Sequence, residues 1–570
     1  MTATLERRAE PAGGGGPVPA HIRRHLATLL PSRDDLRPLR TSWRRDLLAG
    51  VTVGVVALPL ALAFGVSSGM GAAAGLVTAI VAGLVAAVFG GSHVQVSGPT
   101  GAMAVVLAPI VAQHGTAAVT SVSVIAGVLL VAAGALRLGR VVVYIPWPVI
   151  EGFTAGIAVI IALQQVPLAL DATVQTGEKT VLAAVDAVRA ADWSHAWLPL
   201  AITVGVVVLI ELLRRLPGSL PAALIAVVVA TVVAETGALD VQRIGALPTH
   251  LPLPVLPAVD PATIQQLFSA AVAVAALAAI ESLLSARVAA GMAQTGRVLP
   301  DREVVGQGLA SIASGLFGGL PATGAIARTA VNVRAGARSR LAAVTHSVLL
   351  AVVVAAGAGL ASRIPLAALA GVLIATTLRM VDVHEVRGLL KVGRSTAATF
   401  AATIACTVLF DLITAVEIGV VLAAFFALRA LADTTHVARE ELPGPPAAGD
   451  EHIALLALQG SLFFGAADRV MDDIADSDAW VVVLRLSKVE LLDPTGAHRL
   501  TGIMQLLEAR GVTVLLKGLR RRHERMASRA GVLDALRTRE HEFDDLEAAV
   551  AHARSHVARQ LAGQPVPKRR

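Results

Sequence analysis

Long apolar segments follow one another between residues 47 and 431 and are separated by short polar stretches. Their apolar residues run continuously and do not alternate with polar residues at period two, which predicts a bundle of membrane helices and not a barrel. Several segments are shorter than the roughly 20 residues that a straight spanning helix needs. We count about fourteen, at 48–66, 72–90, 98–113, 119–136, 147–168, 198–213, 220–236, 267–290, 304–318, 322–333, 341–361, 365–380, 396–411 and 413–431.

The basic residues between the segments predict how the chain crosses the membrane. Loops after even-numbered segments hold most of the Lys and Arg residues, whereas loops after odd-numbered segments hold only Lys179, Arg189, Arg243 and Arg363. The positive-inside rule then places both termini in the cytoplasm. Seven segments precede the second half, so the two halves run through the membrane in opposite directions. The pattern predicts a 7+7 inverted repeat.

A five-residue phrase occurs once in each half, as TGAMA at 100–104 and TGAIA at 323–327. Each copy follows a proline, Pro99 or Pro321, so each predicts an extended stretch followed by a new helix start at membrane depth. Opposed helix N-termini carry partial positive charge and free N–H groups, which suits an anion. The alternative is that both phrases are small-residue motifs for helix packing.

The composition changes after Asp433, where 443–446 (PGPP) indicates a linker. Strands are predicted at 453–464, 480–486 and 512–516, and helices at 466–476, 495–510, 520–532 and 543–559. This alternation predicts a small cytoplasmic α/β domain. The expected organisation is an N-terminal cytoplasmic tail at 1–46, a transmembrane domain at 47–432, a linker at 433–450, the α/β domain at 451–560 and a basic tail at 561–570.

Composition narrows the function class. Hydrophobic residues make up 55% of the 570 residues and charged residues 16%, as expected for an integral membrane protein. The net charge of +7 is explained by the positive-inside pattern and does not require nucleic acid as a partner. Cys406 is the only cysteine, so no intrachain disulfide is expected. We find no P-loop and no convincing catalytic or metal-ligand motif, so neither an enzyme nor a cofactor is expected.

Two charged residues within apolar segments are candidates for function. Arg328 follows Gly324 by four residues inside the second predicted half-helix, where a guanidinium is costly and usually functional. Glu281 lies in the eighth segment, where a carboxylate is a candidate for proton exchange during transport, and Ser285 lies one turn later on the same face. The alternative is that Glu281 and Arg328 form a permanent structural ion pair.

The α/β domain contains one candidate modification site. Asp493, Pro494, Thr495 and Gly496 end a predicted strand and begin a helix, so a phosphate on Thr495 would lie near a helix N-terminus. The alternative is that Thr495 only caps the helix.

These motifs together resemble the sulfate permease (SulP) family of anion transporters, whose animal relatives include prestin and pendrin. The resemblance extends from about residue 44 to 556 and rests on 46–54 (DLLAGVTVG), 97–101 (SGPTG), 280–285 (IESLLS), Gln307-Gly308, 318–321 (GGLP) and 327–329 (ART). The C-terminal part from residue 450 looks like the STAS domain of this family, with its phosphorylation-loop motif at 493–496.

The resemblance implies a core domain and a gate domain, elevator-like alternating access and a homodimer. Carried over by position, the substrate contacts would come from Thr100, Gly101, Ala102, Gly324, Ala325, Ile326 and Ala327, with Arg328 nearby. Sodium-dependent members carry a hydroxyl side chain at the position of Ile326. The isoleucine side chain in this sequence has no oxygen atom and cannot bind sodium. This departure favours a proton over sodium as the coupling ion.

We therefore expect a multi-pass transporter in the plasma membrane that moves a small anion (sulfate, bicarbonate or a dicarboxylate) by proton symport, with membrane lipid around it. The alternatives are an uncoupled exchanger or channel, a sodium-coupled bicarbonate carrier, and a membrane-anchored scaffold whose STAS-like domain binds regulatory partners.

Overall fold

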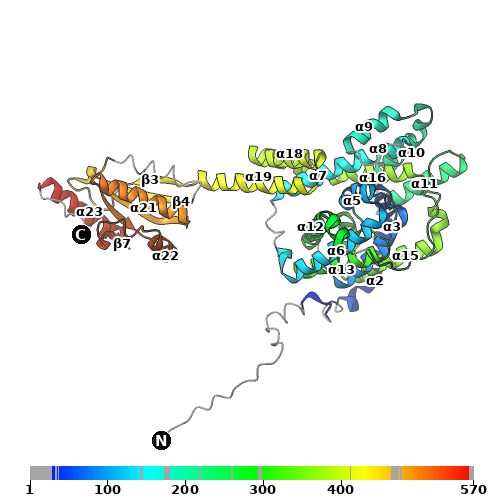
Figure 1. Ribbon diagram of the computed structural model, residues 1–570, viewed down its shortest axis with the longest axis horizontal. Helices are drawn as coiled ribbons and strands as arrows, with labels where there is room; N and C mark the ends of the chain where they lie inside the picture. The colour runs from blue at the N-terminus through cyan, green and yellow to red at the C-terminus, as the bar shows by residue number, and fades with distance from the viewer. Residues whose placement is uncertain are drawn as a thin grey trace, which may run out of the picture. The chain divides into compact units, whose positions relative to one another are not determined.

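The computed structural model describes residues 28–563, except 33–34, 36–37, 141–145, 173–179, 217–219, 258–260, 293–297, 411, 464–473 and 475–477. The chain forms two compact units, residues 1–420 and 421–570, which we call the helical unit and the sheet unit (Figure 1). Each is described separately.

The helical unit is built from apolar helices at the places where the hydrophobic segments predict them. Eight described helical stretches are long and apolar enough to cross a membrane, and α5 and α11 are shorter apolar helices. The elements are α2 (Leu39–Ser67), α3 (Ala72–Val77), the π-helical η2 (Thr78–Ala82), α4 (Gly83–Phe89), α5 (Gly101–His114), α6 (Thr116–Ala135), α7 (Trp147–Gln164), α8 (Val166–Leu170), α9 (Thr180–Ala190), α10 (Trp193–Leu213), α11 (Ala222–Thr236), α12 (Pro261–Met292), α13 (Pro300–Leu316), α14 (Ile326–Arg334), α15 (Leu341–Ala361), α16 (Leu366–Met380), α17 (Val383–Val392), α18 (Arg394–Leu409) and α19 (Leu412–Asp433), the last of which continues into the sheet unit.

Every one of the fourteen predicted segments corresponds to a helix or to a run of adjoining helices. The boundaries differ most at α2 and α12, which begin at Leu39 and Pro261 instead of residues 48 and 267. Hydropathy identifies only the apolar part of a helix, so a helix with a polar first turn is predicted to begin too late. The short helices α9 and α17 are additional. The number of membrane crossings stays a prediction.

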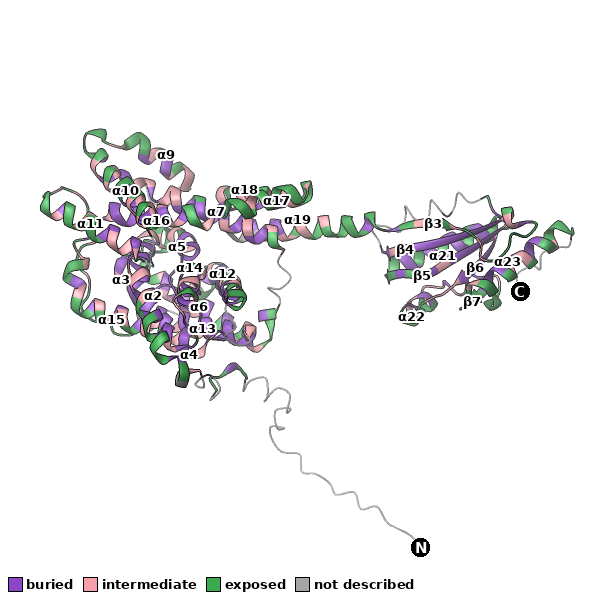
Figure 2. Ribbon diagram, turned by 180° about the vertical axis from the view of Figure 1, so that it is seen from behind, coloured by how far each residue is buried: buried purple, intermediate pink, exposed green. Residues whose placement is uncertain are grey.

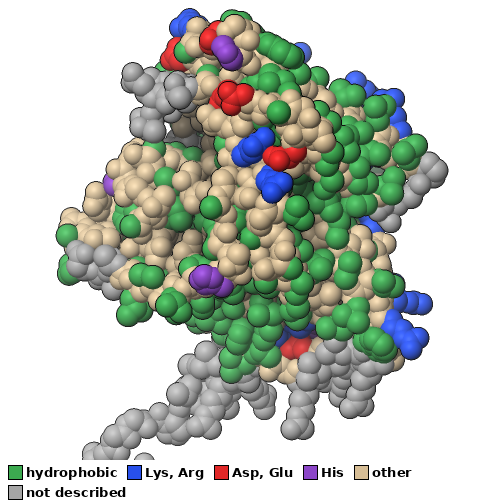
Figure 3. Space-filling model, turned by 90° about the vertical axis from the view of Figure 1, so that its right-hand side faces the viewer, with side chains coloured by type: hydrophobic (Ala, Val, Ile, Leu, Met, Phe, Trp, Pro, Cys, Tyr) green, Lys and Arg blue, Asp and Glu red, His purple; other side chains and the backbone are tan. Residues whose placement is uncertain are grey.

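Exposed apolar side chains cover much of one face of the molecule (Figure 3). On α10, Val204, Val208 and Leu212 are each about half exposed and lie four residues apart, so they form one stripe along the helix. A stripe of this kind is unfavourable in water and is what a helix facing lipid presents.

The sheet unit contains a five-stranded sheet in the order β3 (His436–Glu440), β4 (Ile453–Leu462), β5 (Val481–Leu492), β6 (Thr513–Lys517) and β7 (Glu542–Phe543). The pair β3–β4 is antiparallel and the other three pairs are parallel. Strand β3 lies where a linker was expected, because an edge strand with exposed polar residues shows no hydrophobic run.

Helices cover both faces of this sheet. Leu456 and Leu484 pack on one face with Leu500 of α21 (Pro494–Ala509). Leu455 and Val483 lie on the opposite face and pack with residues of α23 (Leu546–Leu561). The buried central strands appear purple in Figure 2. The predicted α/β architecture is therefore confirmed; a further helix, α22, spans Arg521–Arg529, whereas the helix predicted at 466–476 lies almost entirely outside the described residues.

Candidate anion-binding site

Two short strands bring the repeated phrases together inside the helical unit. Strand β1 (Ser97–Gly98) pairs antiparallel with β2 (Thr323–Gly324), with Ser97 opposite Gly324 and Gly98 opposite Thr323. Helix α5 starts three residues after β1, and α14 starts two residues after β2. The two broken helices that the sequence predicts therefore begin side by side.

The two helix starts are not equivalent within the phrase. Thr100 is the N-cap of α5, and its hydroxyl accepts a hydrogen bond from Met103 N at 3.4 Å. In the second copy the helix starts two residues later, at Ile326, and its N-cap Ala325 provides no side-chain bond. The reason is that Gly324 is held in β2, where its N–H donates to Ser282 Oγ at 2.9 Å.

Glu281 connects both phrases through one carboxylate oxygen. The hydroxyls of Thr100 and Thr323 each lie 2.8 Å from Glu281 Oε2 and 3.0 Å from one another. Glu281 itself is half-buried on α12. Thr323 was absent from the predicted contacts, although its place as the first residue of the second phrase, matching Thr100, was a signal for it.

Arg328 is buried at the start of α14, with 2% of its surface exposed. Its Nη2 donates to the carbonyl oxygen of Pro99, directly before the first phrase, and its Nη1 is buried without a hydrogen-bond partner. Among the described residues no Glu281–Arg328 ion pair forms within 4.0 Å. The permanent ion pair considered from the sequence is therefore not present in this structure, and one side of the guanidinium remains unpaired.

The predicted backbone contacts divide into two groups. Ala325 N donates to Val96 O and Gly324 N to Ser282, so these two N–H groups are already occupied. The first backbone hydrogen bonds of the two helices are donated by Thr329 N in α14, to Ala325 O, and by Ala104 N in α5, to Thr100 O. The remaining N–H groups without a partner inside their helix belong to Gly101, Ala102, Ile326, Ala327 and Arg328.

Ser282 and Ser285 support this arrangement from α12. Both are fully buried. Ser285 Oγ donates to Thr329 Oγ1 at 3.1 Å, so in this structure its hydroxyl holds α14 and does not bond to Glu281. Ser282, which the sequence did not single out for a role, fixes the backbone of Gly324.

A buried polar network positions the segment before β1. Glu303 accepts hydrogen bonds from Gly91 N at 2.7 Å and from the side-chain amides of Gln95 at 2.9 Å and Gln307 at 2.8 Å. A Cβ on Gly324 would overlap the Gln95 amide. Because the contacts with Gly91 and Gln95 span more than 200 residues, hydropathy alone could not identify Glu303 or Gln95.

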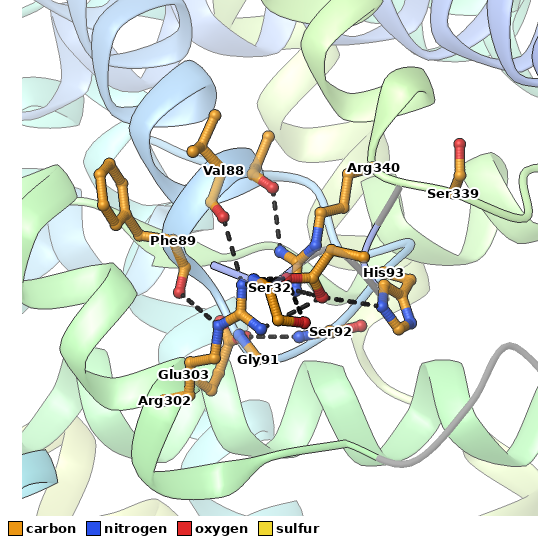
Figure 4. Close-up of polar contacts among 12 residues, drawn as sticks. Ser32, Val88, Phe89, Gly91, Ser92, His93, Arg302, Glu303, Ser339 and Arg340 are labelled. Atoms are coloured by element: carbon orange, nitrogen blue, oxygen red, sulfur yellow. Dashed lines mark hydrogen bonds and ion pairs between the residues drawn. The ribbon is translucent and has the colours of Figure 1, made fainter. Parts of the chain in front are cut away.

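A second buried network ties the segment before α2 to the same unit (Figure 4). The Arg302 guanidinium donates to both carboxylate oxygens of Asp35 at 3.1 and 2.9 Å, and Arg340 Nη2 lies 3.2 Å from Asp35 Oδ1. Both arginines also donate to carbonyls at the end of α4, at Phe89 and Ala87. All three charged side chains are buried, although the sequence placed Asp35 in a cytoplasmic tail and both arginines in loops.

Replacing Asp35 by alanine is expected to lower the free energy of unfolding by roughly 3 kcal/mol, because two buried guanidinium groups lose their shared counter-charge. Glu303 still interacts with Arg340 and limits the loss. Denaturant unfolding of the detergent-solubilised protein measures the effect, with the exposed Asp240→Ala as control. Equal midpoints for the two variants would contradict it.

The same contact predicts a pH dependence. Burial by itself raises the pKa of Asp35, but the hydrogen bond from Arg302, the Ser32 N–H and the charge of Arg340 outweigh it and hold the pKa well below its usual range. A carboxyl group with a lowered pKa stabilises the fold above about pH 4, and this contribution is lost as the pH falls further. The stability difference between wild type and Asp35→Ala should therefore shrink below about pH 4.

In the sheet unit, the N-cap of α21 is Asp493, whose Oδ1 accepts from Gly496 N at 2.6 Å. The interpretation of Thr495 as the cap is therefore wrong. Thr495 is exposed in the first turn of α21, as phosphorylation would require, and this modification stays a prediction.

Comparison with known proteins agrees with the motifs. The sulfate permease family matches residues 43–403, and the STAS domain matches residues 445–549. "Putative sulfate transporter YvdB" of Bacillus subtilis is 34% identical over 88% of this chain and 96% of its own length. The bicarbonate transporter BicA of Synechocystis is 32% identical over 83% of this chain and 88% of its own length.

Solved structures show the same fold. The transmembrane domain of a cyanobacterial BicA aligns with a TM-score of 0.59 at 35% identity, covering 66% of this chain and 97% of that domain. Murine Slc26a9, an anion transporter solved in the inward-facing state, aligns with a TM-score of 0.81 over 97% of this chain and 100% of its own, at 16% identity. With the family match over more than half of its length and two relatives above 30% identity, this chain belongs to the sulfate permease family, with a STAS domain at its C-terminal end.

Proposed function

We propose that this protein is a secondary active transporter that carries a small anion across the plasma membrane together with a proton. The anion binds between the starts of α5 and α14, beside Arg328. Glu281 carries the proton. The relatives above are named for sulfate and for bicarbonate, and both anions fit a site made largely of backbone N–H groups.

The observation that carries this proposal is the unpaired Nη1 of Arg328. A buried guanidinium nitrogen without a hydrogen-bond partner costs free energy, and an anion is the group that would satisfy it. The free N–H groups at the two adjacent helix starts add partial positive charge at the same place. A helix-packing role for the repeated phrases does not require a buried, half-paired guanidinium.

The geometry also supports coupling to a proton. An ionised Glu281 would balance the positive Arg328, with which it interacts electrostatically. Protonation of Glu281 removes one negative charge beside the anion site, so an anion and a proton favour the binding of each other. The hydroxyls of Thr100 and Thr323 can bond to either form of the carboxyl group.

The remaining organisation is proposed from the family. The helical unit would divide into a core domain and a gate domain that move in an elevator-like cycle, and two copies of the chain would associate in the lipid bilayer with all termini in the cytoplasm. The fourteen helical segments and their charge pattern are compatible with that arrangement.

One observation favours sodium as a second candidate for the coupling ion. Three oxygen atoms, from Glu281, Thr100 and Thr323, lie within 3.0 Å of one another, and hard cations prefer such oxygen ligands. Ile326 provides no side-chain oxygen, so the ligand set is smaller than that of sodium-dependent relatives.

Uptake of labelled sulfate, bicarbonate and succinate into proteoliposomes tests the proposal. An inward gradient of about 1.5 pH units is worth about 2 kcal/mol per proton and should drive about 30-fold accumulation of sulfate or succinate for each coupled proton at zero membrane potential. Bicarbonate uptake has to exceed that of protein-free liposomes, because diffusing CO2 gives the same ratio without a carrier. Accumulation that follows a sodium gradient instead would favour the sodium carrier. Flux that responds only to voltage or to an internal counter-anion would overturn symport in favour of a channel or an exchanger.

A further inference from the structure

Three histidines meet in the sheet unit, where the proposed anion site has no residues. His541 ends a short 3-10 turn, η5 (Arg539–His541), immediately before the edge strand β7. His552 and His556 lie on α23, four residues apart and therefore on the same helix face. One ligating nitrogen from each ring lies within 4.8 Å of those of the other two.

The distances among these nitrogens suit a tetrahedral ion. Nε2 of His552 and Nε2 of His556 are 3.1 Å apart and hydrogen bond to one another, a bond that a bound ion would replace. Zinc binds imidazole nitrogen at 2.0–2.1 Å, so two ligands of a tetrahedral zinc ion lie about 3.3 Å apart. The third nitrogen therefore has to approach by at most about 1.5 Å, which a small shift of η5 would provide.

The orientation of His541 supplies an independent argument. A backbone hydrogen bond to Val514 of β6 engages its ring. Its Nδ1 is buried and has no hydrogen-bond partner, although only 4% of the residue is exposed. In many metal sites the imidazole donates one N–H to a backbone carbonyl and presents the other nitrogen to the ion. His541 has this arrangement with its second nitrogen unused.

The protonation states also suit a cation. Burial, with a further contribution from His552, lowers the pKa of His541 to about 4, and burial with the nearby Arg559 lowers the pKa of His556 to about 4. Both rings are neutral at physiological pH and offer a lone pair. A cluster of charged imidazolium groups would repel a metal ion, whereas these neutral rings do not.

The surrounding charges partly balance one another. Arg537 is neutralised by Glu508, with 2.8 Å between Nη2 and Oε2. Glu540 interacts favourably with His552, whereas Arg559 opposes an added cation. The residual repulsion weakens binding without blocking the three nitrogens.

We propose that His541, His552 and His556 bind a divalent first-row transition metal ion, with zinc as the reference ion and one position open to water. Imidazole nitrogens are preferred ligands of such ions. The bound ion would connect α23 to the turn before β7 and so stabilise the C-terminal part of the sheet unit.

Zinc titration of the full-length protein tests the proposal. The protein is purified with an affinity tag that lacks histidine, stripped with a chelator, and titrated with Zn²⁺ by calorimetry, and with Co²⁺ by visible absorption, which reports tetrahedral coordination. We expect one ion per chain and a higher thermal midpoint with Zn²⁺.

The variants His552→Asn and His556→Asn are expected to weaken binding at least tenfold and to remove the shift of the midpoint. The matched control is His498→Asn, an exposed histidine on α21 of the same unit, which should bind like wild type. His552 is half-exposed, so its variant tests the site even if the buried His556 is needed for folding. Absence of saturable binding, or equal binding in wild type and His552→Asn, would overturn the proposal. Several weak ions per chain, unaffected by the variants, would do the same.

Discussion

Replacing Glu281 by glutamine is expected to abolish the accumulation of the anion that a proton gradient drives. Glutamine has nearly the same shape and can still hydrogen bond to the hydroxyls of Thr100 and Thr323, so the local fold should remain. It cannot gain or lose a proton, however, so uptake no longer responds to pH. Exchange of labelled for unlabelled anion at equal pH should continue.

The uptake assay described above measures this difference. A suitable control is Glu211→Gln on α10, which removes a carboxylate that is paired with Arg214 and does not contact the repeated phrases. It should respond to the gradient like wild type. If Glu281→Gln still accumulates the anion with the gradient, Glu281 has a structural role and the proton is carried elsewhere.

Replacing Arg328 by glutamine should impair binding of every anion that the protein accepts. Glutamine has no positive charge, and the loss of a charge-assisted hydrogen bond costs about 1.5–3 kcal/mol, which corresponds to about 10-fold to 150-fold weaker binding. The half-saturation concentration for uptake should rise by this factor, or uptake should become undetectable. Arg328→Lys should recover only part of the binding, because an ammonium group lacks the planar fork that can serve Pro99 and an anion together.

The control for this experiment lies on the same helix. Arg334 is exposed in the last turn of α14, so Arg334→Gln removes an equal charge while leaving the site intact. Its uptake should match wild type. Thermal unfolding separates loss of binding from loss of fold, since removal of the buried Arg328 leaves the Pro99 carbonyl unpaired. Uptake of Arg328→Gln with an unchanged half-saturation concentration would exclude Arg328 from the anion site.

The Glu281 and Arg328 predictions test different halves of the proposal. If Glu281→Gln no longer responds to the proton gradient but still exchanges labelled for unlabelled anion, the result concerns the coupling ion. If Arg328→Gln binds the anion more weakly, the result concerns the anion-binding site. A transporter with the expected Arg328 phenotype and an unaffected Glu281→Gln would retain the anion site and need another coupling mechanism.

Helices, half-helices and the two candidate charges could be predicted because their signals are local. Long apolar runs favour helices in lipid wherever they occur, and Pro99 and Pro321 interrupt such runs through their own backbone geometry. Glu281 and Arg328 could be identified because a charged group within an apolar segment costs free energy at membrane depth and is therefore rare there. The alternation of strands and helices after residue 450 likewise predicted the sheet unit.

The contacts that make these residues into a site have no local signal. Glu281 bonds to Thr100 from 181 residues away, and Asp35 bonds to Arg302 and Arg340 across 267 and 305 residues. The start of α14 at Ile326 instead of Gly324 depends on pairing of β2 with β1. The three histidines meet because α23 covers one face of the sheet as far as β7, which His541 precedes.

Sequence alone therefore determined which segments form apolar helices, where two of them break, and which charged residues lie within apolar segments, because hydropathy and backbone geometry act within a few residues. Only the tertiary structure decided that Arg328 bonds to Pro99 and not to Glu281, and that Thr323 joins Thr100 at one carboxylate oxygen. Those choices depend on the register between packed segments and on side-chain directions, and hydrogen bonds change partner over shifts of one or two ångströms.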